Sequence, residues 1–385
     1  MLEKLRYLTA GESHGKGLLG IIDGIPANLE ISEQYIRYQL SRRQKGHGRS
    51  NRMKIEDDSP QICSGVRLGK TLGSPIGIII KNNDWKNWKK KMSIEKIDEK
   101  IKKITLPRPG HADLAGIQKY DFNDIRNIIE RSSARETAMR VALGSVCRKL
   151  LENFNIFIGS HVTSIYNIQD EDDYSKISPD EINSKADLSL VRCLNQNIEN
   201  KMINAISLAK DNGDSVGGSF RVYISGVPFG LGGYSSWSEK LNARLGQALL
   251  SINGIKSFDV GLGSLSENKL GSELHDEIGY EKNKFVRYSN NCGGIEGGMS
   301  NSETIILSAT MKPIPTLIKP LKSIDIDSKE QVLAHKERTD SCSVPAASII
   351  AESMACFVIC DAILEKFGGD SMEQLTAHIK KTAKY

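Results

Sequence analysis

The sequence is poor in cysteine, and its cysteines follow no metal-binding spacing. Seven occur in 385 residues, and none belongs to a Cys-x-x-Cys pair. An odd number without a regular array argues against a disulfide framework and against a zinc site. We therefore expect no metal, and we expect a reducing cytoplasm as the compartment.

The chain also offers no pattern typical of a leader peptide or a membrane span. Its first residues have neither the apolar core of a signal peptide nor the Arg- and Ser-rich composition of a transit peptide. The longest apolar stretch, from Pro345 to Leu364, contains Glu352 and Asp361. These charges favour a buried helix, so we expect no membrane partner.

Two glycine-rich segments lack residues that a nucleotide-binding loop requires. Only three residues lie between Gly65 and Gly69, where a P-loop needs four. Gly261-Leu262-Gly263 has no third glycine of the dinucleotide fingerprint. We expect neither site, and we interpret the first segment as a turn before a strand from Ile76 to Lys81.

Acidic residues are missing from one region, between Glu33 and Glu56. This region contains a basic, glycine-interrupted run from Arg42 to Lys54. Guanidinium groups on such a loop suit a ligand with several negative charges, because they bind phosphate and carboxylate in a bidentate fashion. Nucleic acid is the competing partner for the same run.

A helix start is indicated further along the chain. Ser133 and Glu136 stand in the Ser-x-x-Glu relation of a capping box, and apolar residues follow at helical spacing. A helix beginning here would turn its N–H groups toward Arg131 and Arg135, where an anion could bind. The alternative is one continuous helix from about Asp124, and the local pattern does not decide between the two.

Several short segments carry groups suited to chemistry or to close backbone approach. His14 lies in the segment Gly11 to Gly15, which predicts a loop that presents its ring. Glycines in residues 290–301 would let the backbone lie flat against a planar ring or a phosphate, or form a tight hairpin. Lys312 to Thr316 is a rigid, extended segment. Asp340 ends a mixed-charge segment and suits either an ion pair or, with a ligand, catalysis.

A strand–turn–helix pattern occurs twice. One strand ends at Gly24-Ile25-Pro26 and another at Gly226-Val227-Pro228, and a Ser-Glu helix start follows each, at Ser32 and Ser238. This likeness predicts two similar halves that pack into one body.

Two charged segments lie between these two units in the sequence. We interpret residues 84–104 as a mobile basic segment, either a partial lid or a surface that could stack on single-stranded nucleic acid. We interpret residues 169–187 as an acidic surface connection.

Five motifs occur in an order that resembles chorismate synthases, and the likeness runs from Tyr7 to about Leu364. The family's implied reaction is the 1,4-elimination of phosphate from 5-enolpyruvylshikimate 3-phosphate to give chorismate. It requires reduced FMN without net oxidation or reduction. The motifs are Gly11–Gly15, Arg42–Gln44, Arg131–Thr137, Gly293–Gly298 and Arg338–Asp340.

The resemblance also implies binding residues, and the arginines among them suit a substrate with one phosphate and two carboxylates. The residues implied for substrate binding are Arg43, Arg49, Arg52, Arg108 and Arg135. The residues implied for flavin binding are Arg131, Ser132, Ser133, Gln247, Ala248, Gly297, Lys312, Pro313, Ile314, Pro315, Thr316 and Arg338.

By the same resemblance, His14, His111 and Asp340 are the catalytic residues. His14 would protonate the departing phosphate, and His111 would protonate the reduced flavin near N1. Asp340 would help the flavin N5 accept the proton lost from C6 of the substrate. Imidazole, whose ordinary pKa is about 6.5, suits proton donation near neutral pH.

The implied fold is α+β, a β-α-β sandwich with a helical layer between antiparallel sheets and pseudo-symmetric halves. Residues 1–385 are expected to form a single catalytic domain within a homotetramer. The insertions of bifunctional fungal members are missing, so we expect a monofunctional enzyme supplied with reduced flavin by the cell or by an external flavin reductase. NADPH would then act only indirectly. Two other classes stay open: a flavin-dependent oxidoreductase acting on another anionic substrate, and a nucleic-acid-binding protein.

Overall fold

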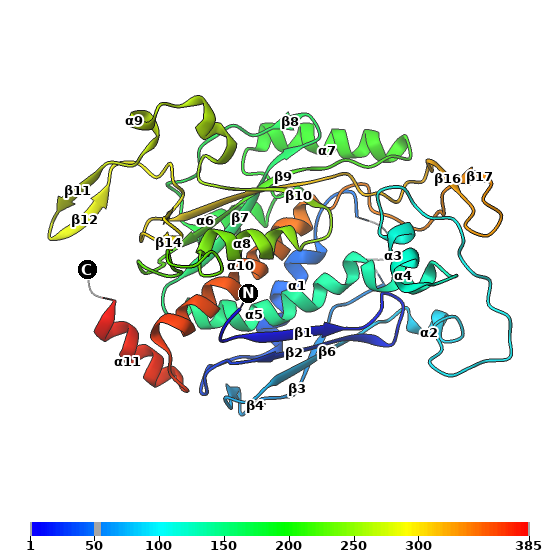
Figure 1. Cartoon of the computed structure of the whole chain (residues 1–385), viewed down its shortest axis with the longest axis horizontal. Helices are drawn as coiled ribbons and strands as arrows, with labels where there is room; N and C mark the ends of the chain where they lie inside the picture. The colour runs from blue at the N-terminus through cyan, green and yellow to red at the C-terminus, as the bar shows by residue number, and fades with distance from the viewer. Residues whose placement is uncertain (1, 50–54, 384–385) are drawn as a thin grey trace.

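Alternating apolar residues in the N-terminal part build a four-stranded antiparallel sheet (Figure 1). The computed structural model describes residues 2–49 and 55–383. The order β1-β2-β6-β3 joins β1 (Arg6–Ala10), β2 (Gly17–Asp23), β6 (Ile76–Lys81) and β3 (Pro60–Ser64). Along β2, Leu18 and Ile22 are buried, whereas Leu19 and Ile21 are exposed. Only one face of this sheet therefore packs on the core, as the two-residue period of a strand allows.

The second sheet has five antiparallel strands, in the order β10-β15-β9-β7-β8. Phe220 and Val222 of β9 belong to the main hydrophobic core, whereas the neighbouring Tyr223 packs with Ile182 in a separate cluster. Both faces of the central strand are therefore covered. The strands are β7 (Phe157–Ile165), β8 (Ile168–Gln169), β9 (Gly218–Ser225), β10 (Ile255–Val260) and β15 (Ile305–Met311).

A helical layer lies between the two sheets (Figure 1). It consists of α1 (Glu33–Gln44), α5 (Thr137–Glu152), α8 (Leu241–Leu250) and α10 (Val344–Phe367). Among the described residues, α10 is the one helix long and apolar enough to span a membrane, and it is buried inside the protein. This burial confirms the core helix expected from Pro345 to Leu364. The layered α+β fold expected from the resemblance is also confirmed.

The two halves follow the same path. The first runs β1, β2, α1, β3, β6, α5, and the second runs β7, β9, α8, β10, β15, α10. In the first sheet β1 and β2 are neighbours, and β6 lies between β2 and β3. In the second sheet β7 and β9 are neighbours, and β15 lies in the same way between β9 and β10. This agreement supports the predicted duplication. The second helix begins at Leu241, however, and not at Ser238, because Leu241 N–H bonds to the carbonyl of Gly298 in a distant hairpin.

A charged cluster is buried in the helical layer. Glu352 of α10 is fully buried and pairs with Arg42 of α1 at 2.8 Å, Arg148 of α5 at 2.6 Å and Arg192 at 3.2 Å. Burial would raise the pKa of Glu352, but the arginine charges outweigh it and lower that pKa to about 2. The expected loop is therefore wrong for Arg42 and Arg43, which belong to the last turn of α1, and Arg42 has a structural role.

The two charged segments differ in how far they enter the core. In residues 84–104 the one regular element is α2 (Trp85–Trp88), and its mobility stays a prediction. Residues 169–187 contain α6 (Pro179–Ala186), whose Ile182 is fully buried. Asp187 pairs with Arg42 at 2.6 Å. A purely surface connection is therefore wrong for this second segment.

The remaining elements are short or lie at the edges. Two of them, β4 and β5, form a hairpin at the predicted turn after Gly65. These elements are β4 (Val66–Arg67), β5 (Lys70–Thr71), α3 (Asp113–Tyr120), α4 (Arg126–Ser132), a 3-10 helix (Ala134–Glu136), α7 (Gln196–Asp211), a second 3-10 helix (Gly263–Asn268), α9 (Gly271–Leu274), β11 (Ile278–Glu281), β12 (Lys284–Arg287), β13 (Ile295–Glu296), β14 (Met299–Ser300), β16 (Lys322–Ile324), β17 (Gln331–Leu333) and α11 (Met372–Thr382).

Candidate active site

One cavity collects residues from distant parts of the chain. Its volume is about 620 Å³, within the range of small-molecule sites. Its walls come from the loop after β1, the end of α1, the start of α5, the segment after β15 and the residues before α10. The described residues that line it include eight Lys or Arg and three Asp or Glu. The cavity therefore attracts anions.

Arg135 and Arg43 enter this cavity held by a buried carboxylate. Arg135 donates from Nε to Asn82 Oδ1 at 3.1 Å and pairs with Asp58. Arg43 donates to Thr137 Oγ1 at 3.1 Å and lies 3.7 Å from Asp58. Burial lowers the pKa of Arg43 to about 10, although Asp58 opposes the shift. Both guanidinium groups are thus fixed in place and positively charged at neutral pH.

Arg49 and Asp340 form a second pair in the cavity wall. Their side chains are 2.8 Å apart, and Ser343 donates to Asp340 at 3.2 Å. The pair connects the loop after α1 to the start of α10. Arg52, the remaining expected substrate-binding arginine, lies outside the described residues.

Arg108 and His111 share the carboxylate of Asp113, at the start of α3. His111 Nδ1 lies 2.5 Å from Asp113 Oδ1, and Arg108 Nε donates to Oδ2 at 2.8 Å. Burial would raise the pKa of Asp113, but hydrogen bonds from His111 and Arg108 outweigh it and hold that pKa below its ordinary value. Arg108 also donates to Thr316 Oγ1 at 2.8 Å. An ionised carboxylate therefore orients both side chains.

His14 lines the cavity and is nearly buried, with 9% of its side chain exposed. Its Nδ1 lies 2.9 Å from Glu130 Oε1. Its ring stacks on Trp88, with ring centroids 3.9 Å apart. The loop after β1 does present the ring, as expected, but presents it to a cavity and not to bulk solvent.

The helix break expected at Ser133 is present. After α4 ends at Ser132, Ser133 is extended, and a 3-10 turn leads into α5. Ser133 Oγ accepts the Arg135 N–H at 3.2 Å, whereas Glu136 pairs with Arg140 at 2.8 Å. The alternative of one continuous helix is therefore wrong, and Ser133 caps the turn at Arg135 N–H instead of forming the expected pair with Glu136.

The structure brings part of the expected flavin-binding set to the cavity. Arg131 turns away, because it donates to the carbonyls of Thr9 at 2.7 Å and Gly11 at 3.2 Å. Gln247 and Ala248 of α8 also lie outside the cavity within the described chain. The members of the set that line it are Ser132, Ser133, Lys312, Pro313, Ile314, Pro315, Thr316 and Arg338.

The glycine cluster forms the tight hairpin that was one of its two interpretations. Gly297 and Gly298 make the turn between β13 and β14 with φ of +60° and +94°. Gly297 is exposed and does not line the cavity. Its assignment to flavin binding stays a prediction.

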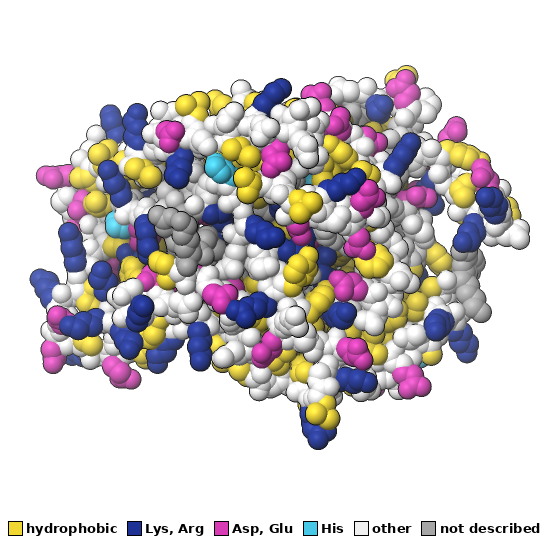
Figure 2. Space-filling model, turned by 180° about the vertical axis from the view of Figure 1, so that it is seen from behind, with side chains coloured by type: hydrophobic (Ala, Val, Ile, Leu, Met, Phe, Trp, Pro, Cys, Tyr) yellow, Lys and Arg dark blue, Asp and Glu magenta, His cyan; other side chains and the backbone are white. Residues whose placement is uncertain are grey.

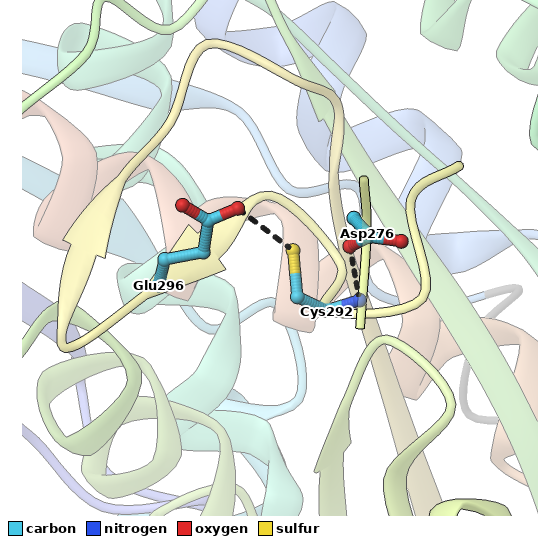
Figure 3. Close-up of side chains that lie close together, drawn as sticks. All are labelled: Asp276, Cys292 and Glu296. Carbon is cyan, nitrogen blue, oxygen red and sulfur yellow. Dashed lines mark hydrogen bonds between the residues drawn. The ribbon is translucent and has the colours of Figure 1, made fainter. Parts of the chain in front are cut away.

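Asp276, Cys292 and Glu296 come close together next to this hairpin (Figure 3). Glu296 pairs with Arg287 at 2.5 Å, and Asp276 accepts the Cys292 N–H at 3.0 Å. Burial raises the pKa of Cys292 to about 12, so the thiol keeps its proton. A metal ligand must be deprotonated and free to coordinate the ion. These groups instead form hydrogen bonds or ion pairs within the protein. We assign no metal to the cluster.

Five residues around the cavity were not singled out from the sequence. Arg126 connects several of them, donating to Glu130 at 3.0 Å and Glu337 at 2.8 Å. Burial would raise the pKa of Glu337, but the His335 ring 3.5 Å away and the charge of Arg126 lower it to about 2. Of the five, only Asp113 could have been identified from the local sequence, because it lies two residues after His111. The five are Trp88, Asp113, Arg126, Glu130 and Glu337.

Basic side chains outside the cavity are mixed with acidic ones. Figure 2 shows Lys and Arg spread over one face of the molecule, with Asp and Glu among them. The described residues on this face form no continuous basic stripe of the kind that tracks a nucleic-acid backbone.

Comparison with known proteins agrees with the fold. A family profile described as chorismate synthase matches residues 5–364. Chorismate synthase of Alkaliphilus metalliredigens is 52% identical over 371 residues, covering 96% of this chain and 97% of the relative. That of Aquifex aeolicus is 50% identical, covering 97% and 96%. A crystal structure of chorismate synthase superposes with a TM-score of 0.80 at 39% identity, covering 100% of this chain and 98% of its own. The chain belongs to the chorismate synthase family.

Proposed function

We propose that this chain eliminates phosphate from 5-enolpyruvylshikimate 3-phosphate to form chorismate, using bound reduced FMN without net oxidation. Family membership makes it a carbon–oxygen lyase of the last step of the shikimate pathway. The observation that supports the finer proposal is one cavity lined by many cationic side chains and three histidines, two of which, His14 and His111, each lie against a buried carboxylate.

The cationic groups fit the three anionic groups of this substrate. Nη2 of Arg135 is buried, has no hydrogen-bond partner among the described residues and lies 3.7 Å from Glu56. A phosphate or carboxylate oxygen would supply that partner. Arg43, Arg49 and Arg108 line the same cavity. We propose that these four bind the substrate, together with Arg52.

The apolar part of the cavity fits a flat ring system. Ile129, Met311 and the Pro313–Pro315 segment line it beside Ser132 and Ser133. The proposed flavin would be held by this wall and by Lys312, Thr316 and Arg338. When bound, reduced FMN would supply electron density to the allylic system of the substrate and take it back.

The proposed proton movements use groups that face the cavity. His14, as an imidazolium whose Nδ1–H is held by Glu130, would deliver a proton from Nε2 to an oxygen of the departing phosphate as the carbon–oxygen bond breaks, and would be left as the neutral Nδ1–H tautomer. His111, held by Asp113, would keep a proton on its ring toward the flavin. Asp340, held by Arg49 and Ser343, would help to remove the C6 proton.

The assembly and its surroundings are also proposals. We propose a single catalytic domain, as the continuous core suggests, in a cytoplasmic homotetramer. The seven unpaired cysteines are compatible with a reducing compartment. Because Gln247, Ala248 and Gly297 lie outside the cavity, they would contact flavin only in another copy of the chain. Reduced flavin would come from the cell or an external reductase, with NADPH as an indirect source.

Anaerobic turnover tests this function. With 5-enolpyruvylshikimate 3-phosphate and chemically reduced FMN, chorismate and phosphate should appear in equal amounts. Phosphate without chorismate, or no product at all, would contradict the proposal. An oxidoreductase would instead consume flavin, and a nucleic-acid-binding protein would keep salt-sensitive binding to nucleic acid in the presence of the substrate.

A further inference from the structure

His14 is fixed from two sides by residues that no motif connects to it. Glu130 of α4 contacts it twice: Oε2 accepts the His14 backbone N–H at 2.7 Å, and Oε1 lies 2.9 Å from Nδ1. The backbone carbonyl of Glu130 also accepts the Ser13 N–H at 2.9 Å. The loop after β1 is therefore attached to α4 through Glu130, in addition to the bond from Arg131 to the Gly11 carbonyl.

The charge of Glu130 decides which ring nitrogen of His14 carries the fixed proton. The carboxylate is 2% exposed. Burial would raise the pKa of Glu130, but hydrogen bonds from His14 outweigh it and lower that pKa. An ionised carboxylate can only accept, so the nitrogen facing it must be Nδ1–H. Nε2 is then the nitrogen left to exchange a proton with the cavity.

Trp88 of α2 limits the tilt of the ring. Its indole stacks on His14 at an angle of 24° between the ring planes. Asp84 accepts the Trp88 Nε1–H at 3.2 Å, and the guanidinium of Arg126 lies 5.1 Å from the indole centroid. Arg126 also donates to Glu130, so the carboxylate and the indole share one support.

We propose that Glu130 and Trp88 are positioning residues for His14: Glu130 selects the Nδ1–H tautomer and Trp88 fixes the ring plane, so that Nε2 faces the cavity. The consequence for turnover rests on the proposed function. The tautomer itself does not, because it follows from the contacts of His14 alone.

The substitution Glu130→Gln separates charge from shape. Glu130 accepts the His14 backbone N–H at Oε2, and both the ring Nδ1–H and Arg126 at Oε1, and glutamine replaces one of these oxygens by an NH₂ donor. The backbone N–H of His14 is always a donor and keeps the remaining oxygen, while Arg126 retains Glu337 as its acceptor. Nδ1 then faces an NH₂ group, accepts from it and loses its proton to Nε2. We expect the neutral tautomer of His14 to invert.

Solid-state ¹⁵N NMR of the full-length protein labelled at the histidine ring nitrogens measures this directly. The His14 signals are identified by their loss in His14→Gln. The control is Glu136→Gln, which removes a buried carboxylate paired with Arg140 that does not line the cavity. Wild type and control should show His14 as Nδ1–H, and Glu130→Gln as Nε2–H. An unchanged Nδ1–H signal in Glu130→Gln would overturn the proposal.

Kinetics provide a second readout. We expect Glu130→Gln to lower kcat on the order of 100-fold with KM nearly unchanged. Without the carboxylate the ring no longer holds Nδ1–H and Nε2–H together, and neutral imidazole is a far weaker general acid, whereas substrate binding is kept. Trp88→Ala should lower kcat, and Trp88→Phe should restore most of it by retaining the stack. An unchanged kcat in Glu130→Gln would overturn the positioning role. If wild type and every variant are inactive but the tautomer inverts in Glu130→Gln as expected, the proposed function is contradicted. The assignment of the tautomer still holds in that case.

Discussion

Arg135 stays in the cavity through contacts that only a planar guanidinium can make together. Nε donates to Asn82, Nη1 pairs with Asp58, and Nη2, which has no hydrogen-bond partner among the described residues, lies 3.7 Å from Glu56. Lysine keeps the charge but not this geometry. We expect Arg135→Lys to raise the KM for the phosphorylated substrate at least about tenfold, or about 1.4 kcal/mol, in anaerobic steady-state kinetics.

The matched control for this prediction is Arg37→Lys. Arg37 pairs with Asp57 at 2.5 Å, but both side chains are more than half exposed and neither lines the cavity. Its KM should match wild type. If Arg135→Lys also leaves KM unchanged, Arg135 does not bind the substrate.

At the residue scale, the sequence led to several groups that line the cavity and missed those behind them. The glycines around His14 predicted a loop that presents its ring, whereas the expected catalytic roles of His14 and His111 came from the family resemblance and not from a local pattern. Glu130 lies 116 positions from His14, and only the packing of α4 against the loop after β1 brings them together. A buried carboxylate that serves a distant histidine leaves no local signal.

At the scale of elements, two glycines end corresponding strands of the two halves. Gly24 has φ of +93° and Gly226 of +76°, and an added Cβ would lie 2.3 Å from Lys4 O and 2.1 Å from Asn155 O. Alanine therefore meets both backbone strain and a clash with backbone. We expect Gly24→Ala and Gly226→Ala each to lower the free energy of unfolding by about 3 kcal/mol or more in urea denaturation.

Gly69→Ala is the control, because it separates strain from collision. Gly69 has φ of +76°, but nothing lies within 4 Å of an added Cβ. It should cost only about 1 kcal/mol. Equal effects at all three positions would mean that the close approach of the strands does not matter.

Local patterns were enough for single elements but not for their pairing. The strand from Ile76 to Lys81 and the buried helix from Pro345 were predicted because hydrophobicity alone defines them. The placement of β6 between β2 and β3 was not predicted, because it depends on contacts across the sheet. The start of α8 was misplaced for the same reason, since a distant hairpin carbonyl fixes Leu241.

At the scale of the whole molecule, Glu352 joins helices of both halves. Its pKa falls from its ordinary value of 4.5 to about 2 when the protein folds. The resulting stabilisation is present above about pH 4.5 and is lost as the pH falls toward 2. In Glu352→Gln, unfolding measured in urea should therefore depend less on pH between 5 and 2.

The same substitution also leaves three buried arginines without their shared partner. We expect a loss on the order of 3–5 kcal/mol at pH 7. Glu181→Gln, which breaks an exposed pair with Lys185, should change stability by less than about 1 kcal/mol. A loss of similar size in both variants, or an unchanged pH dependence in Glu352→Gln, would contradict a central role for the buried cluster.

We propose that the whole cavity performs an elimination in which flavin is required but not consumed. The number of chorismate molecules formed per flavin, measured in one sealed anaerobic reaction with the flavin spectrum recorded throughout, tests this proposal. Many products per flavin, with the flavin still reduced at the end, is the expected result. One product per flavin, with the flavin oxidised, would contradict the claim and assign the cavity to a redox reaction.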